Sequence, residues 1–187
     1  MLRAFVAINV PPLPALLAAL NELRQMGRAV RPVDPENLHL TLRFLGALEH
    51  GQLEPITAIL QRTAQDWPAF DLAITGAGVF PDANRPTLVW AGLGDAVCVA
   101  AIAQQVERIN HHLTEELDLS QDVRTWTAHL TLARIKARPP AALHDFLQQR
   151  RDLHLGTMHV RSIDLMLSDL TPTGPNYTIA ASCPLRS

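Results

Sequence analysis

His39-Leu40-Thr41-Leu42 recurs unchanged as His129-Leu130-Thr131-Leu132, once in each half of the 187-residue chain. In an extended strand, alternate side chains point to the same face. The leucines are therefore expected to face a core, while each histidine and its threonine project together from the opposite face. Two such strands lying side by side would present two imidazoles and two hydroxyls to one groove.

This set of side chains suits phosphoryl transfer without a metal ion. A neutral imidazole accepts a proton, while a protonated imidazole donates one. The hydroxyls of Thr41 and Thr131 can donate hydrogen bonds to the non-bridging oxygens of a phosphate. A single histidine on a strand is ordinarily a packing residue, so the matched pair is what favours a catalytic role. Because the motifs are identical, the residues alone leave open which of His39 and His129 is the acid.

Composition and charge restrict the class of protein. Hydrophobic residues make up 48% of the chain and charged residues 18%, which is typical of a globular domain. A net charge of −2 does not produce the broad positive surface potential that binding a long nucleic acid requires.

The two cysteines, Cys98 and Cys183, and the other histidines show no metal-ligand spacing, so we expect no metal ion and no cofactor. No apolar run reaches the roughly 18 residues that span a bilayer, and prolines interrupt the N-terminus too early for a signal peptide. We expect a cytoplasmic protein without a membrane partner.

The hydrophobic periodicity predicts strands and helices in both halves of the chain. Strands are expected at residues 2–8, 38–45, 70–79, 87–93, 127–135, 158–169 and 177–180. Helices are expected at residues 13–26, 52–65, 95–117 with Asp95 as the cap, and 139–150. This mixed order favours an α+β fold with mostly antiparallel sheets. No glycine-rich turn joins a strand to a helix, so neither a Rossmann nor a P-loop fold is supported.

Four segments, in order along the chain, carry a wider resemblance. They are residues 34–46 (DPENLHLTLRFLG), 80–93 (FPDANRPTLVWAGL), 129–134 (HLTLAR) and 167–177 (LSDLTPTGPNY). Together they resemble the RNA 2′,3′-cyclic phosphodiesterases, also called 2′-5′ RNA ligases, of the 2H phosphoesterase superfamily. The mark of that superfamily is a pair of HxTx motifs on separate halves of the chain.

The resemblance implies a fold and an activity. The fold is bilobal, with two pseudo-twofold-related halves flanking a central cleft and helices on the outside, in a single 2H phosphoesterase domain (1–187) with two interleaved lobes. The activity is hydrolysis of RNA 2′,3′-cyclic phosphate ends to 2′-phosphate, and many members also join tRNA halves through a 2′-5′ linkage without ATP. The expected partner is therefore an RNA end, bound by a monomer.

The resemblance also implies a role for each motif residue. His39 would be the general acid that protonates the departing 3′ oxygen, and His129 the base that activates water. Thr41 and Thr131 would hold the phosphate oxygens. Arg134, just after the second motif, would be a phosphate clamp.

Strand parity bears on two arginines. Arg43 has the same parity as His39 and is expected to reach the cleft and bind phosphate, or else to lie on the surface at a strand end. Arg134 has the opposite parity from His129, so a flat strand would turn it away from the groove. A β-bulge or a strand end would bring it back.

Three aromatic residues, Phe44, Trp126 and Tyr177, are candidates for stacking on bases, although each also fits a packing role. The chain departs from the family where Ala128 replaces the proline that usually precedes the second histidine. We expect that change to loosen the start of the second motif strand.

Two other functions are compatible with the residues. One is a 2H phosphoesterase acting on another cyclic phosphate, such as ADP-ribose 1″,2″-cyclic phosphate, or on 2′-5′ oligonucleotides. The other is an RNA-end binding module that keeps the motifs but turns over poorly. The low net charge favours recognition of an RNA end over a long duplex.

Overall fold

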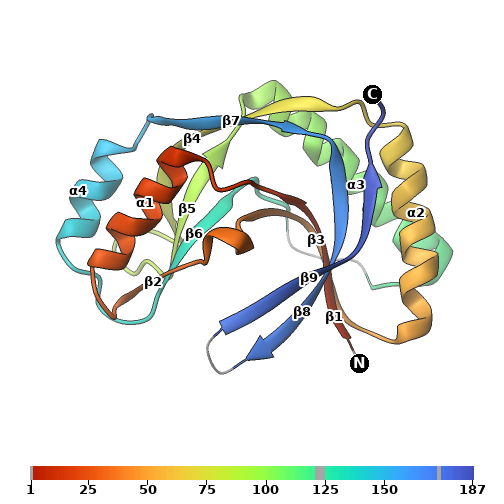
Figure 1. Cartoon of the computed structure of the whole chain (residues 1–187), viewed down its shortest axis with the longest axis horizontal. Helices are drawn as coiled ribbons and strands as arrows, with labels where there is room; N and C mark the ends of the chain where they lie inside the picture. Colours follow the sequence, from red (N-terminus) through yellow and green to blue (C-terminus); the bar gives the residue numbers. More distant parts are fainter. Residues whose placement is uncertain (1, 121–124, 172–173) are drawn as a thin grey trace.

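The strands and helices of the chain are seen in a computed structural model that describes residues 2–120, 125–171 and 174–187 (Figure 1). The strands are β1 (Leu2–Asn9), β2 (Val30–Pro32), β3 (His39–Leu48), β4 (Phe70–Phe80), β5 (Leu88–Leu93), β6 (Leu130–Ile135), β7 (His154–Val160), β8 (Ser162–Thr171) and β9 (Gly174–Pro184). The helices are α1 (Pro14–Gln25), α2 (Leu53–Gln65), α3 (Ala96–Leu117) and α4 (Ala142–Gln149), with short 3-10 turns η1 (Pro35–Asn37) and η2 (His50–Gln52).

The four predicted helices are confirmed to within a few residues, whereas several strand predictions need correction. The single strand predicted over 158–169 is two strands, because the chain changes partners at Arg161: β7 pairs with β4, and β8 pairs with β1 and β9. The strand predicted over 127–135 begins only at Leu130, and β9 is longer than the predicted 177–180. The three-residue β2 was not predicted, because so short a segment shows no period. Between the predicted strands 158–169 and 177–180, Pro172 and Thr173 lie outside the described residues.

One curled sheet runs through the molecule in the order β7-β4-β5-β6-β3-β1-β8-β9, with β2 paired to β6. Each ladder between these strands is antiparallel, which confirms the predicted α+β class. Helices α1 and α4 cover the half that contains β4 to β7, and α2 and α3 cover the half with β1, β3, β8 and β9 (Figure 1). Helix α1 directly follows β1 but packs on the opposite half of the sheet, against β2, β6 and β7.

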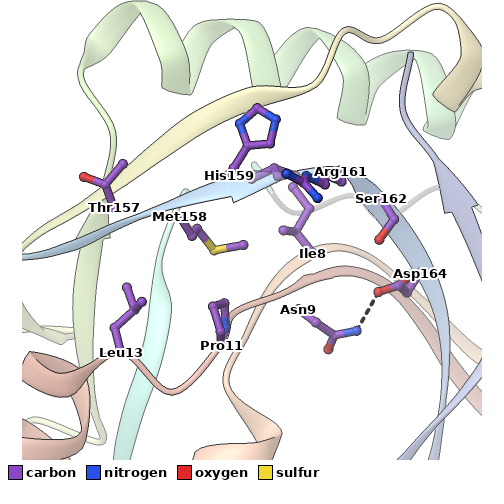
Figure 2. A pocket seen from close by; sticks show the side chains of 11 residues that line it. Ile8, Asn9, Pro11, Leu13, Thr157, Met158, His159, Arg161, Ser162 and Asp164 are labelled. Carbon is purple, nitrogen blue, oxygen red and sulfur yellow. Dashed lines mark hydrogen bonds between the residues drawn. The ribbon is translucent and has the colours of Figure 1, made fainter. Parts of the chain in front are cut away.

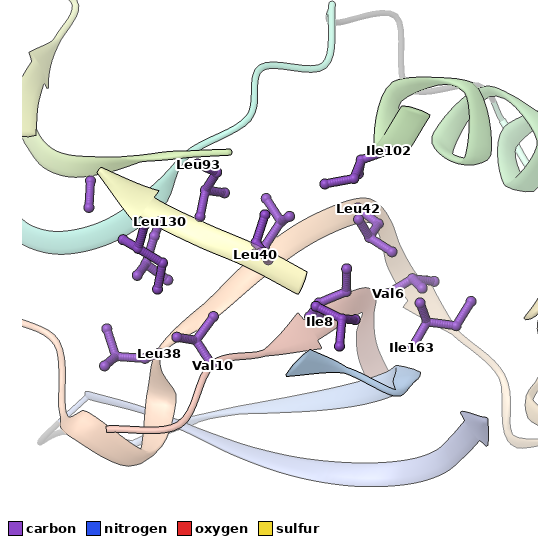
Figure 3. Close-up of a cluster of buried hydrophobic side chains, with 14 of the residues drawn as sticks. Val6, Ile8, Val10, Leu38, Leu40, Leu42, Leu93, Ile102, Leu130 and Ile163 are labelled. Carbon is purple, nitrogen blue, oxygen red and sulfur yellow. The ribbon is translucent and has the colours of Figure 1, made fainter. Parts of the chain in front are cut away.

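The two lobes meet where β3 pairs with β6, at Leu40 and Leu130. Both leucines are fully buried in the main hydrophobic cluster, together with Ile8, Leu42 and Ile102 (Figure 3). The leucine face of the repeated motif is therefore the core face, as the alternation predicts.

Helix α3 begins where the sequence predicts. The carboxylate of Asp95 accepts a hydrogen bond from the backbone N–H of Cys98 at 2.8 Å, which satisfies a donor in the first turn. This cap sets the start of a helix that later contributes Asn110 to the region behind the motifs. Among the described residues, no helix has the length and apolar character needed to cross a membrane.

Replacing Leu40 by alanine should lower the free energy of unfolding by about 3 kcal/mol, since it removes a fully buried leucine at the junction of the lobes. Urea denaturation measures this change. Leu153→Ala is the matched control, because Leu153 is 47% exposed and its truncation should cost less than about 0.5 kcal/mol. Equal losses for the two variants would contradict a central role for the Leu40–Leu130 contact.

Candidate active site

The two copies of the repeated motif lie next to each other at the centre of the sheet. Leu40 is paired with Leu130 in an antiparallel ladder. One step to either side, His39 lies across from Thr131 and Thr41 lies across from His129. All four polar side chains therefore project from the face opposite the buried leucines. The structure brings together the two histidines and two threonines that the sequence singled out.

Both imidazoles are oriented in the same way by the backbone. Nδ1 of His39 lies 2.7 Å from the carbonyl oxygen of Asn37, and Nδ1 of His129 lies 2.8 Å from that of Thr127. A carbonyl oxygen can only accept a hydrogen bond, so in both rings Nδ1 carries a proton and donates it. Proton transfer to or from a ligand consequently falls to Nε2 in both histidines.

Aromatic rings flank the two histidines. The ring of His39 lies 4.9 Å from Phe5 and 5.2 Å, edge-on, from Tyr177. The ring of His129 lies 5.3 Å, edge-on, from Phe80. These contacts limit the rotation of each imidazole. Phe5 was not identified from the sequence, where it forms part of an ordinary apolar strand.

Burial lowers the pKa of His39 below the ordinary histidine value of about 6.5. The hydrogen bond to the Asn37 carbonyl opposes this shift, while the positive charges of His129 and Arg134 add to it. Burial also raises the pKa of Tyr177, partly offset by Arg134, so its phenol stays neutral. The protonated form of His39 is therefore a stronger acid than an ordinary imidazolium.

The pairing register skips one residue at the same point of each motif. On β3, Thr41 pairs with Ala7 and Arg43 with Val6, so Leu42 has no partner on β1. On β6, Thr131 pairs with Trp90 and Ala133 with Val89, so Leu132 has no partner on β5. Such bulges place two consecutive residues on the core side and reverse the parity of the residues that follow.

The bulge on β6 resolves the parity conflict at Arg134. Leu132 and Ala133 are both buried, and Arg134 returns to the exposed face. Arg134 lies three residues beyond Thr131, the residue across from His39, so it is on the His39 side of the motif pair. Its positive charge contributes to lowering the pKa of His39.

The equivalent bulge on β3 overturns the position expected for Arg43. The parity argument put this side chain on the face of His39 and Thr41, but Arg43 is 2% exposed. Its guanidinium donates to the side-chain oxygen of Asn110 on α3 and, at 2.7 Å, to the carbonyl oxygen of Ser120. Arg43 thus ties β3 to α3, and it forms part of the inner wall of the pocket beside His129.

A pocket of about 330 Å³ opens beside His129. Its lining residues come from β3, the end of β4, α3 and the segment before β6: Thr41, Leu42, Arg43, Phe44, Phe80, Val106, Asn110, Thr125, Trp126, Thr127 and His129. Phe44 is 52% exposed, an unusual position for a large apolar ring. Of the three stacking candidates, Phe44 and Trp126 line this pocket, whereas Tyr177 stands on the other side of the groove against His39.

Two side chains outside the motifs hold the carbonyl groups that orient the histidines. The indole N–H of Trp126 donates to the carbonyl oxygen of Thr41 at 2.9 Å, which fastens the segment containing Thr127 to β3. The amide of Asn37 donates to the carbonyl oxygen of Pro175 on β9 at 3.2 Å. The start of the second motif strand, expected to be loose for want of a proline, is therefore anchored by Trp126. Hydrogen bonds to a backbone carbonyl leave no pattern in the sequence, so neither anchor was predicted.

Within residues 2–120, 125–171 and 174–187, no three His, Cys, Asp or Glu side chains gather in a way that could hold a metal ion. The groups that converge on the groove are imidazole, hydroxyl, guanidinium and aromatic side chains. Such a set can donate and accept protons, donate hydrogen bonds to anionic oxygens and stack on flat rings.

The amino-acid sequence is similar to a known protein family and to named relatives. Residues 7–90 match the family model described as LigT-like phosphoesterase. An RNA 2′,3′-cyclic phosphodiesterase of Aeropyrum pernix is 37% identical over 166 residues, which covers 86% of this chain and 90% of that protein. A protein of the same name from Methanothermobacter thermautotrophicus is 29% identical over 180 residues, covering 94% of this chain and 95% of that one.

Solved structures agree in fold. The crystal structure of TT0787 of Thermus thermophilus matches with a TM-score of 0.82 and 28% identity, over 99% of this chain and 98% of that one. Escherichia coli LigT in complex with 3′-AMP matches with a TM-score of 0.70 and 24% identity, over 100% and 99% of the two chains. The curled antiparallel sheet with helices on its outside is thus an arrangement already seen in crystals.

The pKa of His39 should rise in the variant Arg134→Gln. Removing a nearby positive charge makes the imidazolium easier to form, so the pKa moves upward from its lowered value toward about 6.5. A titration followed by NMR of the histidine ring protons measures the shift. Arg138→Gln is the control, because it removes an exposed arginine from the segment that follows β6. An unchanged His39 pKa in Arg134→Gln would show that Arg134 lies too far from the groove to act on it.

Proposed function

This chain belongs to the LigT-like phosphoesterase family, and from that premise we propose that it opens 2′,3′-cyclic phosphate ends of RNA by acid–base catalysis between His39 and His129. The activity is that of an RNA 2′,3′-cyclic phosphodiesterase, the name borne by the relatives from Aeropyrum pernix and Methanothermobacter thermautotrophicus. The observation that carries the proposal is the Leu40–Leu130 pair, which sets two histidines and two threonines on one face of the sheet.

In this mechanism the cyclic phosphate lies between the two imidazoles. His129 takes a proton from water at Nε2, and the water oxygen forms a new bond to phosphorus. The bond from phosphorus to the 3′ oxygen breaks, and His39 donates the proton on its Nε2 to that oxygen. The products are a 2′-phosphate and a 3′-hydroxyl. The two histidines end in exchanged protonation states, which solvent restores.

Hydrogen-bond donors and a positive charge stabilise the negative charge that develops on the phosphate. The hydroxyls of Thr41 and Thr131 lie one on each strand, across from the histidines, and donate to the non-bridging oxygens. Arg134 supplies a positive charge on the side of His39. Donors held in place before the reaction stabilise the transition state without reorganisation. The assignment of His39 as acid and His129 as base follows the family resemblance, and the common Nδ1 hydrogen bonds prepare both rings for either role.

The terminal base is proposed to enter the pocket beside His129. Phe44 offers an exposed ring to one face of the base, a contact worth about 1–3 kcal/mol in single-stranded recognition. Trp126 lines the same pocket while its N–H is engaged with Thr41. Tyr177 packs edge-on against the imidazole of His39, and we propose that it contacts the nucleotide from that side.

The same groups would also join RNA ends. If the 5′-hydroxyl of a second RNA replaces water, its oxygen bonds to phosphorus as the 3′ oxygen leaves, and a 2′-5′ linkage results. No ATP is needed, because the cyclic phosphate itself provides the leaving group. We propose tRNA halves as the RNAs so joined and a monomer as the active form.

Hydrolysis of 2′,3′-cyclic AMP and of an RNA with a cyclic end should proceed in EDTA and yield a 2′-phosphate. His39→Ala and His129→Ala should each lower kcat about 100- to 10,000-fold, the range for a lost general acid or base. His144→Ala is the control, since His144 is 75% exposed on α4. The position of the product phosphate is determined by NMR or by chromatography against 2′- and 3′-nucleotide standards.

Three results would revise the proposal in different ways. A 3′-phosphate product would require the acid and base roles to be reassigned. Turnover of ADP-ribose 1″,2″-cyclic phosphate or 2′-5′ oligonucleotides in preference to cyclic RNA ends would change the substrate. Tight binding of cyclic ends without turnover by the folded protein would identify a binding module.

Trp126→Phe should lower kcat about fivefold and leave KM within about twofold. The substitution keeps an aromatic ring in the pocket but removes the hydrogen bond to the Thr41 carbonyl, which costs roughly 1 kcal/mol. Because this hydrogen bond anchors the segment before His129, its loss should shift the imidazole from its reactive position. Steady-state kinetics on 2′,3′-cyclic AMP separate the two constants. A raised KM with unchanged kcat would instead make Trp126 a stacking residue and not an anchor.

A further inference from the structure

A second cavity, of about 450 Å³, lies at the end of β1, where the chain turns toward α1 (Figure 2). Its lining comes from the end of β1 and the link to α1, from β7 and from the start of β8: Ile8, Asn9, Pro11, Leu13, Thr157, Met158, His159, Val160, Arg161, Ser162 and Asp164. The mechanism described above uses none of these residues.

The cavity adjoins the strand that carries the first histidine. Asn9 lines the cavity, and its partner across the β1–β3 ladder is His39. Asn9 also lies beside Met166, whose sulfur is 3.6 Å from the Asn9 amide nitrogen and which packs with Phe5 and Tyr177 in the aromatic cluster around His39. A ligand that lies in the groove and extends past His39 along β1 would therefore reach this cavity.

A buried carboxylate forms one wall. Asp164 is 4% exposed, and its oxygens accept hydrogen bonds from the amide of Asn9 at 2.6 Å and from the hydroxyl of Ser182 at 2.5 Å. These two donors hold the carboxylate in one orientation. Each carboxylate oxygen can accept a second hydrogen bond, so Asp164 can take two further donors that lie side by side.

An apolar wall faces the carboxylate. Met158 and Leu13 approach the cavity from the side opposite Asn9 and Asp164 (Figure 2). A thioether makes favourable contacts with aromatic rings, often at the ring edge, so this wall suits the edge of a base that is turned away from the carboxylate. At the rim, Arg161 is exposed and supplies a positive charge. The other basic side chain at the rim, His159, is hydrogen-bonded through Nδ1 to a carboxylate oxygen of Asp71 at 2.7 Å.

We propose that this cavity binds the base of the second nucleotide of the RNA, the one that precedes the cyclic end, and that it prefers guanine. Guanine presents two adjacent N–H donors on its Watson–Crick edge, which match the two acceptors of Asp164. Adenine presents one donor beside an acceptor, and that acceptor faces a negative oxygen. Arg161, exposed at the rim of the cavity, would attract the backbone phosphate of this nucleotide. This inference rests on the proposed function, since it concerns the same RNA substrate.

The test compares three substrates: 2′,3′-cyclic AMP and the dinucleotides GpA and ApA, each ending in a 2′,3′-cyclic phosphate. For the unmodified protein, kcat/KM should be about tenfold higher for GpA than for 2′,3′-cyclic AMP, and about fivefold higher than for ApA. Asp164→Asn and Met158→Ala should each remove most of the advantage of GpA while leaving turnover of 2′,3′-cyclic AMP within about twofold. Asp145→Asn, at an exposed carboxylate on α4, is the control and should change neither value.

Turnover of the mononucleotide separates failure of this site from failure of the proposed function. If 2′,3′-cyclic AMP is hydrolysed but GpA and ApA have no advantage, the second nucleotide does not use the cavity and the inference is wrong. If Asp164→Asn and Met158→Ala lower turnover of all three substrates in parallel, these residues only support the fold, and the inference is again wrong. Hydrolysis of none of the three substrates by the folded, unmodified protein would overturn the proposed function and this inference with it.

Discussion

The pairing of Leu40 with Leu130 is the contact on which both the fold and the groove depend. It joins the two lobes at the middle of the sheet and buries both leucines completely. A slip of one residue on either strand would turn a histidine and a threonine into the core and a leucine into the groove. Burial of the leucines therefore selects the register, and the register places the polar side chains. Core packing and the geometry of the candidate site are a single constraint.

Residues outside the motif determine how rigidly its histidines are held. Each imidazole donates to a carbonyl two residues earlier, and each of those carbonyl segments is fastened to a different strand. Asn37 reaches Pro175 on β9, and Trp126 reaches Thr41 on β3. The second anchor binds one motif directly to the other, so movement of the segment before β6 would be transmitted to both. The rings of Phe5, Tyr177 and Phe80 complete the restraint from the open side.

The sequence predicted the parts of this structure that follow from a period. Alternation in the repeated motif predicted which face carries His39 and Thr41, and helical spacing predicted α1 to α4. It did not predict a position that depends on a change of register, so Arg43 was expected in the cleft although a bulge buries it against Asn110. Contacts that end on a backbone carbonyl, such as that of Trp126, were also missed, because any residue supplies such a carbonyl.

The two ends of the groove carry different side chains only beyond the repeated motifs. Up to the bulges, the two motif segments are matched: each has a histidine, a threonine and then a leucine that the ladder with β1 or β5 skips. After the bulge, the first side chain on the exposed face is Phe44 on β3 and, on β6, Arg134. Phe44 shares a pocket with His129, while the charge of Arg134 acts on His39. One end of a near-symmetric groove is therefore aromatic and the other cationic. A ligand with a flat ring at one end and negative charge at the other gains both contacts in one orientation and loses both when reversed. Two residues thus distinguish histidines that the repeated motif leaves equivalent.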